Sequence, residues 1–234
     1  MSVPAYARSG QVLPASVAAA LAAADIPASK VSAARRARLS GSERELYFWI
    51  LRGFATSGRP SRSQLDAAAA RLGANPNSAL ATLAREDLIH VDAAGEIVVA
   101  YPFSGRPTSH RVRFPGGHEA YAMCAIDALG VAPMVGQPVA IASHDPLTGE
   151  EVHVRVAPDL EAEWSPRSAV VVTGSHRRGA DSCSACCPVL NFFGSPGTAE
   201  RWLAEHPEII GEQISMDAAI LAGDAVFGDV LGDT

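Results

Sequence analysis

The sequence predicts an α+β fold, in which a winged-helix-like helical module precedes a mixed β-sheet domain with flanking helices. Helix-capping signals cluster in the first 100 residues, whereas turn signals and alternating apolar residues dominate the rest. We therefore divide the chain into an N-terminal extension over residues 1–40 that we expect to be partly flexible, a winged-helix-like module over 41–100, and an α+β domain over 101–234 that carries the candidate site.

Three helices are predicted in the winged-helix-like module. Residues 40–54 place Leu46, Ile50 and Phe54 on one apolar stripe, as in a helix with one buried face. Two further helices are marked by local start and stop signals, namely a capping box at Ser61 and Gln64, a stop at Gly73, and an N-cap and first position at Asn75 and Pro76.

A β-hairpin is predicted next, from residues 88–91 and 97–99 with a turn between them. This order of helices and hairpin is that of a winged helix, a common DNA-binding module. The third helix, however, ends in one cation beside two carboxylates at residues 85–87, whereas duplex DNA requires several phosphate-neutralising cations. We do not expect nucleic acid as a partner, although the basic cluster between residues 30 and 38 leaves that alternative open.

Strands and three helices are predicted after residue 101, and the first helix begins near Cys124, directly after a hairpin. Four segments alternate in polarity around turns, and one is continuously apolar; they are residues 110–114, 118–121, 138–143, 150–156 and 169–173. Two helices follow: one begins at Ser195 and Pro196 and ends at Pro207, and an amphipathic C-terminal helix is marked by Ile220, Phe227 and Leu231.

Composition indicates a globular protein of a reducing compartment. The chain has 234 residues, of which 48% are hydrophobic, and no apolar run of the ~20 residues that a membrane span needs. The N-terminus lacks the order of a secretory signal, so we expect a cytoplasmic protein without membrane attachment. Its four cysteines are then expected to be free thiols, metal ligands or redox groups rather than structural disulfides.

The cysteines fall in two short stretches that suggest one site. In a helix, Cys124 and Asp127 would lie on one face, and the helix N-terminus would lower the pKa of the thiol. A second thiol from the cluster of Cys183, Cys186 and Cys187 could complete a site with two sulfur ligands and one acidic oxygen, which suits a soft metal. Two alternatives remain open: inert buried thiols, and a zinc or redox pair formed by Cys183 and Cys186.

These stretches resemble the organomercurial lyase family, also called alkylmercury lyases. The resemblance is carried by Tyr-Ala-x-Cys-Ala-x-Asp-x-Leu over residues 121–129, Gly136, the Ser143–His144 pair before a Thr-Gly turn, a cysteine four residues ahead of Phe-Phe, and a Thr-Ala-Glu-x-Trp helix. It covers roughly residues 45–232. It implies protonolysis of the carbon–mercury bond of alkyl- and arylmercury compounds, which yields a hydrocarbon and Hg(II).

The resemblance also implies roles for individual residues. Cys124 and Cys187 match the two catalytic cysteines, and Asp127 matches the proton-handling aspartate; all three would contact mercury. The family spacing of cysteine to Phe-Phe falls on Cys187, so Cys186 is the second choice for that ligand. Candidates for lining an apolar pocket that raises the pKa of Asp127 are Tyr121, Met123 and Phe192.

No organic cofactor is implied, because mercury is substrate and product, and cytosolic thiols would accept the metal ahead of a mercuric reductase. Two positions depart from the family pattern: Met123 stands where an aromatic residue is common, and Asp145 where some relatives have a cysteine. The alternative function is a thiol-based, metal-sensing winged-helix transcriptional regulator that binds Hg(II) or another soft metal without catalysis. Asp127 distinguishes the two, since a sensor needs sulfur ligands but no proton donor.

Overall fold

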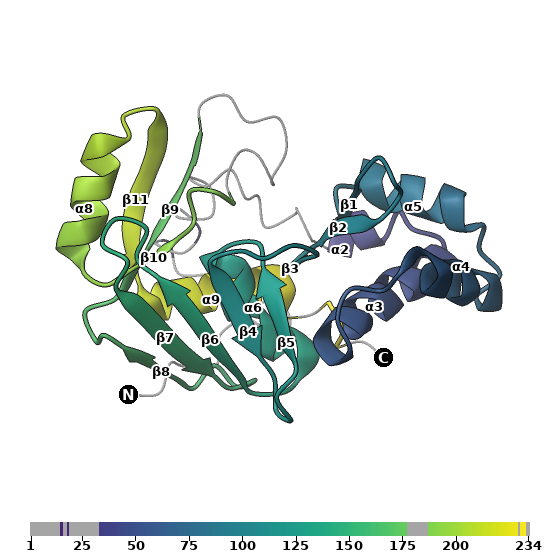
Figure 1. Cartoon of the computed structure of the whole chain (residues 1–234), viewed down its shortest axis with the longest axis horizontal. Coiled ribbons are helices and arrows are strands. Elements are labelled where there is room, and N and C mark those ends of the chain that lie inside the picture. The colour runs from purple at the N-terminus through teal and green to yellow at the C-terminus, as the bar shows by residue number, and fades with distance from the viewer. Residues whose placement is uncertain (1–14, 16–17, 19–32, 177–186, 229, 233–234) are drawn as a thin grey trace.

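The described part of the computed structural model is an α+β protein with N-terminal helices followed by antiparallel sheets and flanking helices, as predicted (Figure 1). The structure describes residues 15, 18, 33–176, 187–228 and 230–232. Within these residues, no helix has both the length and the apolar character that crossing a membrane requires.

Three of the N-terminal helices lie where the sequence predicted them, namely α3 (Gly41–Thr56), α4 (Arg62–Arg71) and α5 (Pro76–Arg85). A short helix that was not predicted, α2 (Ala33–Arg36), precedes them. Ser40 and Ser61 each form a capping box, and the Asn75 side chain accepts a hydrogen bond from the Ser78 N–H group. The apolar stripe of α3 is buried, and this helix packs against both α4 and α5.

The predicted hairpin is present as β1 (Ile89–Val91) and β2 (Ile97–Ala100), which pair antiparallel. Strand β2 also pairs with β3, so the hairpin continues into an eight-stranded sheet with the order β1-β2-β3-β5-β4-β6-β7-β8. Its remaining strands are β3 (Phe103–Ser104), β4 (His110–Arg113), β5 (Glu119–Ala122), β6 (Val139–His144), β7 (Glu151–Val156) and β8 (Ala162–Ser165). All the pairings of the described strands in this sheet are antiparallel, whereas the sequence pattern suggested a mixed sheet.

Helix α6 (Ala125–Val135) covers the buried face of β4, β5 and β6. Alternation along β4 buries His110 and Val112, whose register partners on β5 are Ala122 and Ala120. The same strand, β5, runs directly into α6. The start of this helix is therefore fixed by the register of the sheet.

A second, three-stranded sheet lies beside the first and has the order β10-β9-β11 (Figure 1). Its elements are β9 (Val170–His176), β10 (Phe192–Phe193) and β11 (Ile209–Ser215), with α8 (Pro196–Glu205) between β10 and β11. The predicted C-terminal helix is present as α9 (Met216–Phe227); it packs against α6 and is buried along most of its length, so its apolar surface is wider than the stripe expected from the sequence. Leu231 lies beyond its end.

Candidate active site

Cys124 caps the N-terminus of α6. It has the extended backbone of an N-cap residue, and its Sγ atom accepts a hydrogen bond from the Asp127 N–H group at 3.4 Å. Asp127 is the third residue of the helix, so its carboxyl group lies beside the thiol. The spacing of three residues in the sequence thus becomes a capping arrangement that holds two reactive groups together.

Cys187 reaches this helix start through a short docked loop. The Ala125 N–H group donates to the Leu190 carbonyl at 2.9 Å, and the Val172 N–H group of β9 donates to the Asn191 carbonyl at 3.0 Å. The Asn191 side chain closes the loop by donating to the Pro188 carbonyl at 2.8 Å. Residues 187–191, here called the Cys187 loop, are therefore fixed between the first turn of α6 and β9.

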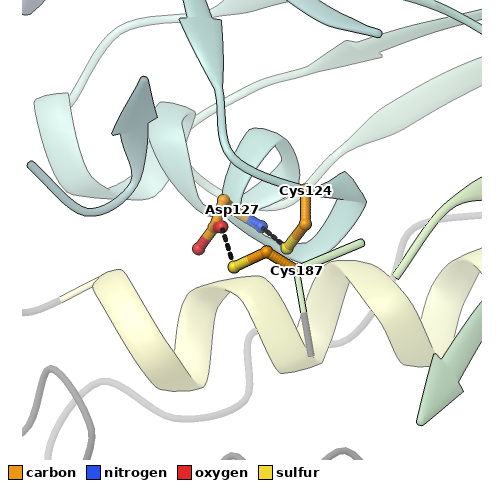
Figure 2. Close-up of side chains that lie close together, drawn as sticks. All are labelled: Cys124, Asp127 and Cys187. Atoms are coloured by element: carbon orange, nitrogen blue, oxygen red, sulfur yellow. Dashed lines mark hydrogen bonds between the residues drawn. The ribbon is translucent and has the colours of Figure 1, made fainter. Parts of the chain in front are cut away.

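The structure brings together the three residues that the sequence singled out (Figure 2). The two sulfur atoms and a carboxylate oxygen all lie within 4.8 Å of one another, and Cys187 Sγ lies 4.0 Å from Asp127 Oδ2. Cys124 is 2% exposed, and Asp127 and Cys187 are each 6% exposed. Both cysteines are free thiols. Cys183 and Cys186 lie outside the described residues.

Burial dominates the electrostatics of the site. It raises the pKa of the Cys124 thiol to about 12, and this effect outweighs the hydrogen bonds that favour the thiolate. The lowered thiol pKa expected from the helix N-terminus is therefore wrong for the metal-free protein. Burial also raises the pKa of Asp127 to about 7, against hydrogen bonds from Cys124 that lower it, in the direction that a proton-donating role requires.

This arrangement combines soft ligands with a proton store. A thiol of high pKa keeps its proton until a metal ion displaces it, and a soft cation such as mercury binds thiolate in preference to oxygen or nitrogen. The adjacent carboxyl group can hold a proton near neutral pH. The site can therefore bind a soft metal and deliver a proton to a group bound to that metal.

Tyr47 is a neighbour of the site that the sequence did not single out, because it falls on the buried side of α3 like an ordinary core residue. It is fully buried, and its hydroxyl donates to the Tyr101 carbonyl at 3.2 Å. Burial, together with the negative charge of Asp127, raises the pKa of Tyr47. Of the predicted lining residues, Phe192 is buried and Met123 and Tyr121 are partly buried; their place in the pocket stays a prediction.

Comparisons with known proteins agree with this geometry. The family model described as "MerB: Alkylmercury lyase" matches residues 103–228, which is more than half of the chain. A solved structure, the mercury-bound form of MerB2, is similar with a TM-score of 0.69 and 24% identity, over 87% of this chain and 98% of that one. At that identity the structural likeness establishes the fold alone.

Curated relatives carry the same family name. The chain is 38% identical to an alkylmercury lyase of Staphylococcus epidermidis over 51% of its own length and 55% of the relative. It is 33% identical to one of Bacillus cereus over 58% of its own length and 60% of that protein. The chain thus spans little more than half the length of these relatives. Since the family model covers most of the sheet-bearing part and the site within it, the chain belongs to the alkylmercury lyase family.

Proposed function

We propose that this protein is an alkylmercury lyase that cleaves the carbon–mercury bond of alkyl- and arylmercury compounds by protonolysis. The observation that carries the proposal is the convergence of two buried thiols and one carboxyl group of raised pKa at the start of α6. The family supports the substrate class, and the similar fold of MerB2 is one that holds mercury.

In the first step, Cys124 captures the substrate. Its sulfur replaces the weakly held ligand of an organomercury cation, and the thiol proton leaves with that ligand. The pKa of about 12 means that mercury, rather than the helix N-terminus, drives this deprotonation. Mercury is now bonded to one thiolate and to the organic group.

In the second step, Cys187 adds its sulfur to the same mercury. Its proton passes to Asp127, whose Oδ2 lies 4.0 Å from Cys187 Sγ. Two thiolates donate electron density to mercury, so the bonded carbon gains carbanion character. Asp127 then protonates this carbon, the electron pair of the carbon–mercury bond forms the new carbon–hydrogen bond, and the hydrocarbon leaves.

Mercury stays in the +2 state throughout, so the reaction needs neither an oxidant nor a reductant. The product is Hg(II) held by the two thiolates, and Asp127 is again ionised. External thiols would remove this ion by ligand exchange. We propose that cytosolic thiols, and a mercuric reductase acting after them, receive it.

Incubation of the purified protein with phenylmercury and excess thiol tests the activity directly. We expect benzene from the wild type, and near-complete loss of benzene from Cys124→Ser and from Cys187→Ser. Asp127→Asn should lower the rate by about 10²- to 10⁴-fold, the usual contribution of a positioned acid. Activity in Cys187→Ser together with inactivity in Cys186→Ser would show that Cys186, not Cys187, is the second mercury ligand.

A different outcome would favour the metal-sensing regulator. Tight Hg(II) binding without benzene release, together with a mobility shift of promoter DNA, would replace the lyase proposal. The position of Asp127 favours the lyase, because metal sensing requires no proton donor, and this carboxyl group lies 4.0 Å from the sulfur of Cys187.

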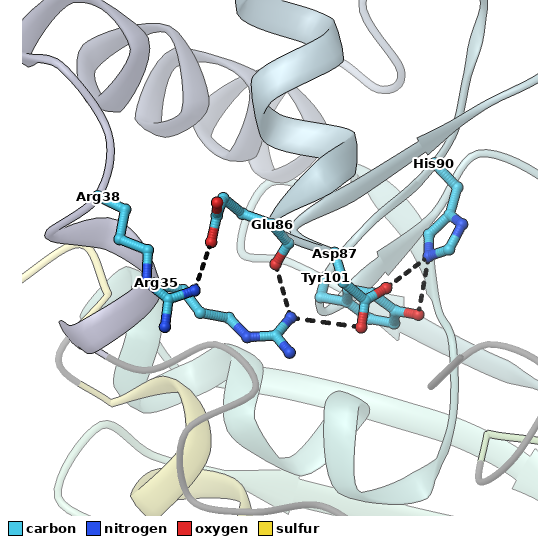
Figure 3. Close-up of polar contacts among 6 residues, drawn as sticks. All are labelled: Arg35, Arg38, Glu86, Asp87, His90 and Tyr101. Carbon is cyan, nitrogen blue, oxygen red and sulfur yellow. Dashed lines mark hydrogen bonds and ion pairs between the residues drawn. The ribbon is translucent and has the colours of Figure 1, made fainter. Parts of the chain in front are cut away.

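We further propose that residues 41–100 form a module that covers the site rather than one that reads DNA. Tyr47 of this module lies within electrostatic reach of Asp127. Cations preceding α3 are engaged at the end of α5, where Arg38 pairs with the Glu86 carboxylate at 2.8 Å and Arg35 donates to the Glu86 carbonyl at 2.6 Å (Figure 3). Arg35 also pairs with the Asp87 carboxylate at 3.4 Å, so both arginines neutralise neighbouring carboxylates and offer little to a phosphate backbone.

A further inference from the structure

A buried histidine links the eight-stranded sheet to the Cys187 loop. His110, at the start of β4, is only 3% exposed, and its Nδ1 atom lies 3.0 Å from the Ser143 hydroxyl of β6. Ser143 is itself 6% exposed. One side of the imidazole ring is therefore fixed to the framework of the sheet.

The other contacts of His110 are with the end of the Cys187 loop. The Asn191 side chain hydrogen-bonds the imidazole, and the ring packs edge-on against Phe192 with the ring centres 5.7 Å apart. Because the Asn191 amide nitrogen donates to the Pro188 carbonyl, the amide oxygen is the atom left to accept from the ring. His110 thus contacts the two residues at which the loop enters β10.

The protonation state of the ring suits a fixed link. Burial lowers the pKa of His110 to about 4, although the Asn191 hydrogen bond opposes this shift, so the imidazole is neutral at neutral pH. A neutral ring has one N–H donor and one acceptor nitrogen. With Nδ1 accepting from the Ser143 hydroxyl, the N–H group faces Asn191, and both partners are satisfied.

We propose that His110 is a positioning residue for Cys187, which acts through Asn191 to hold the Cys187 loop at the distance from α6 at which both sulfurs contact one mercury ion. The loop has one anchor on α6, the hydrogen bond from Ala125 to Leu190, and another on β9. His110 supplies the third, from β4, and ties the loop to the same strand pair that leads into Cys124. The assignment rests on the proposed function for its substrate, but its consequence for metal binding does not require turnover.

Three variants test this role. His110→Leu keeps an apolar side chain but removes both polar contacts. His110→Gln retains a donor that can reach Asn191. Ser104→Ala is the matched control, because this 7% exposed hydroxyl of β3 donates to the Arg106 carbonyl at 2.8 Å and accepts the Arg106 N–H group, both within its own turn.

The main readout is the affinity for Hg(II), measured by competition with a dithiol and by the ultraviolet sulfur-to-mercury absorption. Residues that orient a metal ligand typically contribute about 10- to 100-fold in affinity, so His110→Leu should weaken binding by that factor, towards the value of Cys187→Ser. His110→Gln should restore most of the affinity. Ser104→Ala should lower the melting temperature but leave the affinity unchanged.

Wild-type affinity and absorption in a folded His110→Leu protein would overturn the assignment, as would an equal loss of affinity in Ser104→Ala. Benzene release from phenylmercury is measured in parallel. A wild type that releases no benzene, with the same ranking of Hg(II) affinities among the variants, would refute the lyase proposal and leave the role of His110 standing.

Discussion

At the scale of single residues, Cys124 has two functions that depend on one position. As N-cap of α6 it accepts the Asp127 N–H group, and as a thiol it faces the Asp127 carboxyl group. Sulfur is a weak acceptor, so the cap contributes less to stability than serine would. The proposed role of Cys124 as a soft-metal ligand gives a reason for this weaker cap.

The raised pKa of Asp127 predicts how the metal-free protein responds to pH. The carboxyl group titrates near 3.8 in the unfolded chain and near 7 in the folded protein. As the pH rises from about 4 to about 7, this carboxyl group ionises in the unfolded state but not in the folded state. The free energy of unfolding of the wild type should therefore fall over that range, by roughly 4 kcal/mol at most.

Asp127→Asn should remove this pH dependence. We expect the variant to be more stable than the wild type at pH 8 and close to it at pH 4, in urea unfolding of the metal-free proteins. Asp66→Asn serves as the control, because this partly exposed side chain pairs with its helical neighbour Arg62. Parallel curves of unfolding free energy against pH for Asp127→Asn and the wild type would show that the pKa of Asp127 is not raised by folding.

Asp145 shows the opposite behaviour. Burial opposes its ionisation, but hydrogen bonds from Thr198 and from the N–H groups of Gly194, Leu147 and Thr148 outweigh burial and lower its pKa. Its carboxylate ties the β6–β7 turn to the end of β10, since Oδ2 accepts the Gly194 N–H group at 3.0 Å.

Asp145→Ala should therefore destabilise the protein at pH 7 by about 1–3 kcal/mol, the range for leaving buried donors unpaired. Because a depressed pKa stabilises the fold above the unfolded value, the difference from the wild type should shrink as the pH falls through the folded pKa of Asp145. Thermal unfolding at pH 7 and in acid measures both. A difference that does not change with pH would assign the effect to packing alone.

At the scale of elements, the parts predicted well are those with local signals. The Ser61 capping box and the Asn75–Pro76 start are each read from two to four consecutive residues, and both begin helices. The hairpins around residues 92–95 and 115–117 likewise have turn residues between alternating strands. Each of these signals depends on neighbours in the chain.

The missed elements depend on distant partners. Strand β11 has no buried residue, so its alternation is weak, and it is defined by pairing with β9. Strands β3 and β10 are two residues each, below the length at which a pattern is visible. Helix α9 was predicted from the spacing of Ile220 and Phe227, but its burial, which includes Asp224, depends on packing against α6.

The crossing of α6 and α9 positions the site and depends on glycine. A Cβ atom at Gly130 would lie 2.8 Å from the Gly223 carbonyl oxygen and collide with the Phe227 ring. Gly130→Ala should therefore push the helices apart, lower stability by about 1–3 kcal/mol as overpacking does, and reduce benzene release by moving Asp127 relative to Cys187.

Gly41→Ala is the control for this prediction. Gly41 also lies in a helix, but nothing is within 4 Å of an added Cβ atom, so alanine should leave the melting temperature unchanged or raise it slightly. Differential scanning calorimetry of both variants measures the contrast. Equal melting temperatures for the two would mean that the helix crossing adapts to an extra methyl group.

At the scale of the whole molecule, the site joins two sheets. The eight-stranded sheet supplies Cys124 and Asp127 through β5 and α6, and the loop before β10 of the three-stranded sheet supplies Cys187. The pairing of Cys124 with Asp127 followed from helical spacing. The choice of Cys187 as partner came from the family resemblance, because no local pattern specifies a contact between residues so far apart in the chain.

The most direct test is a single turnover in D₂O at pH 8, with phenylmercury equimolar to the protein and no external thiol. We expect benzene carrying a single deuterium, in an amount equal to the Hg(II) that stays on the protein. In Asp127→Asn, phenylmercury should remain bound with its carbon–mercury bond intact over the time in which the wild type completes its turnover. Benzene formation by Asp127→Asn at the wild-type rate, or mercury retained by the wild type without any benzene, would contradict protonolysis by two thiolates and one carboxyl group.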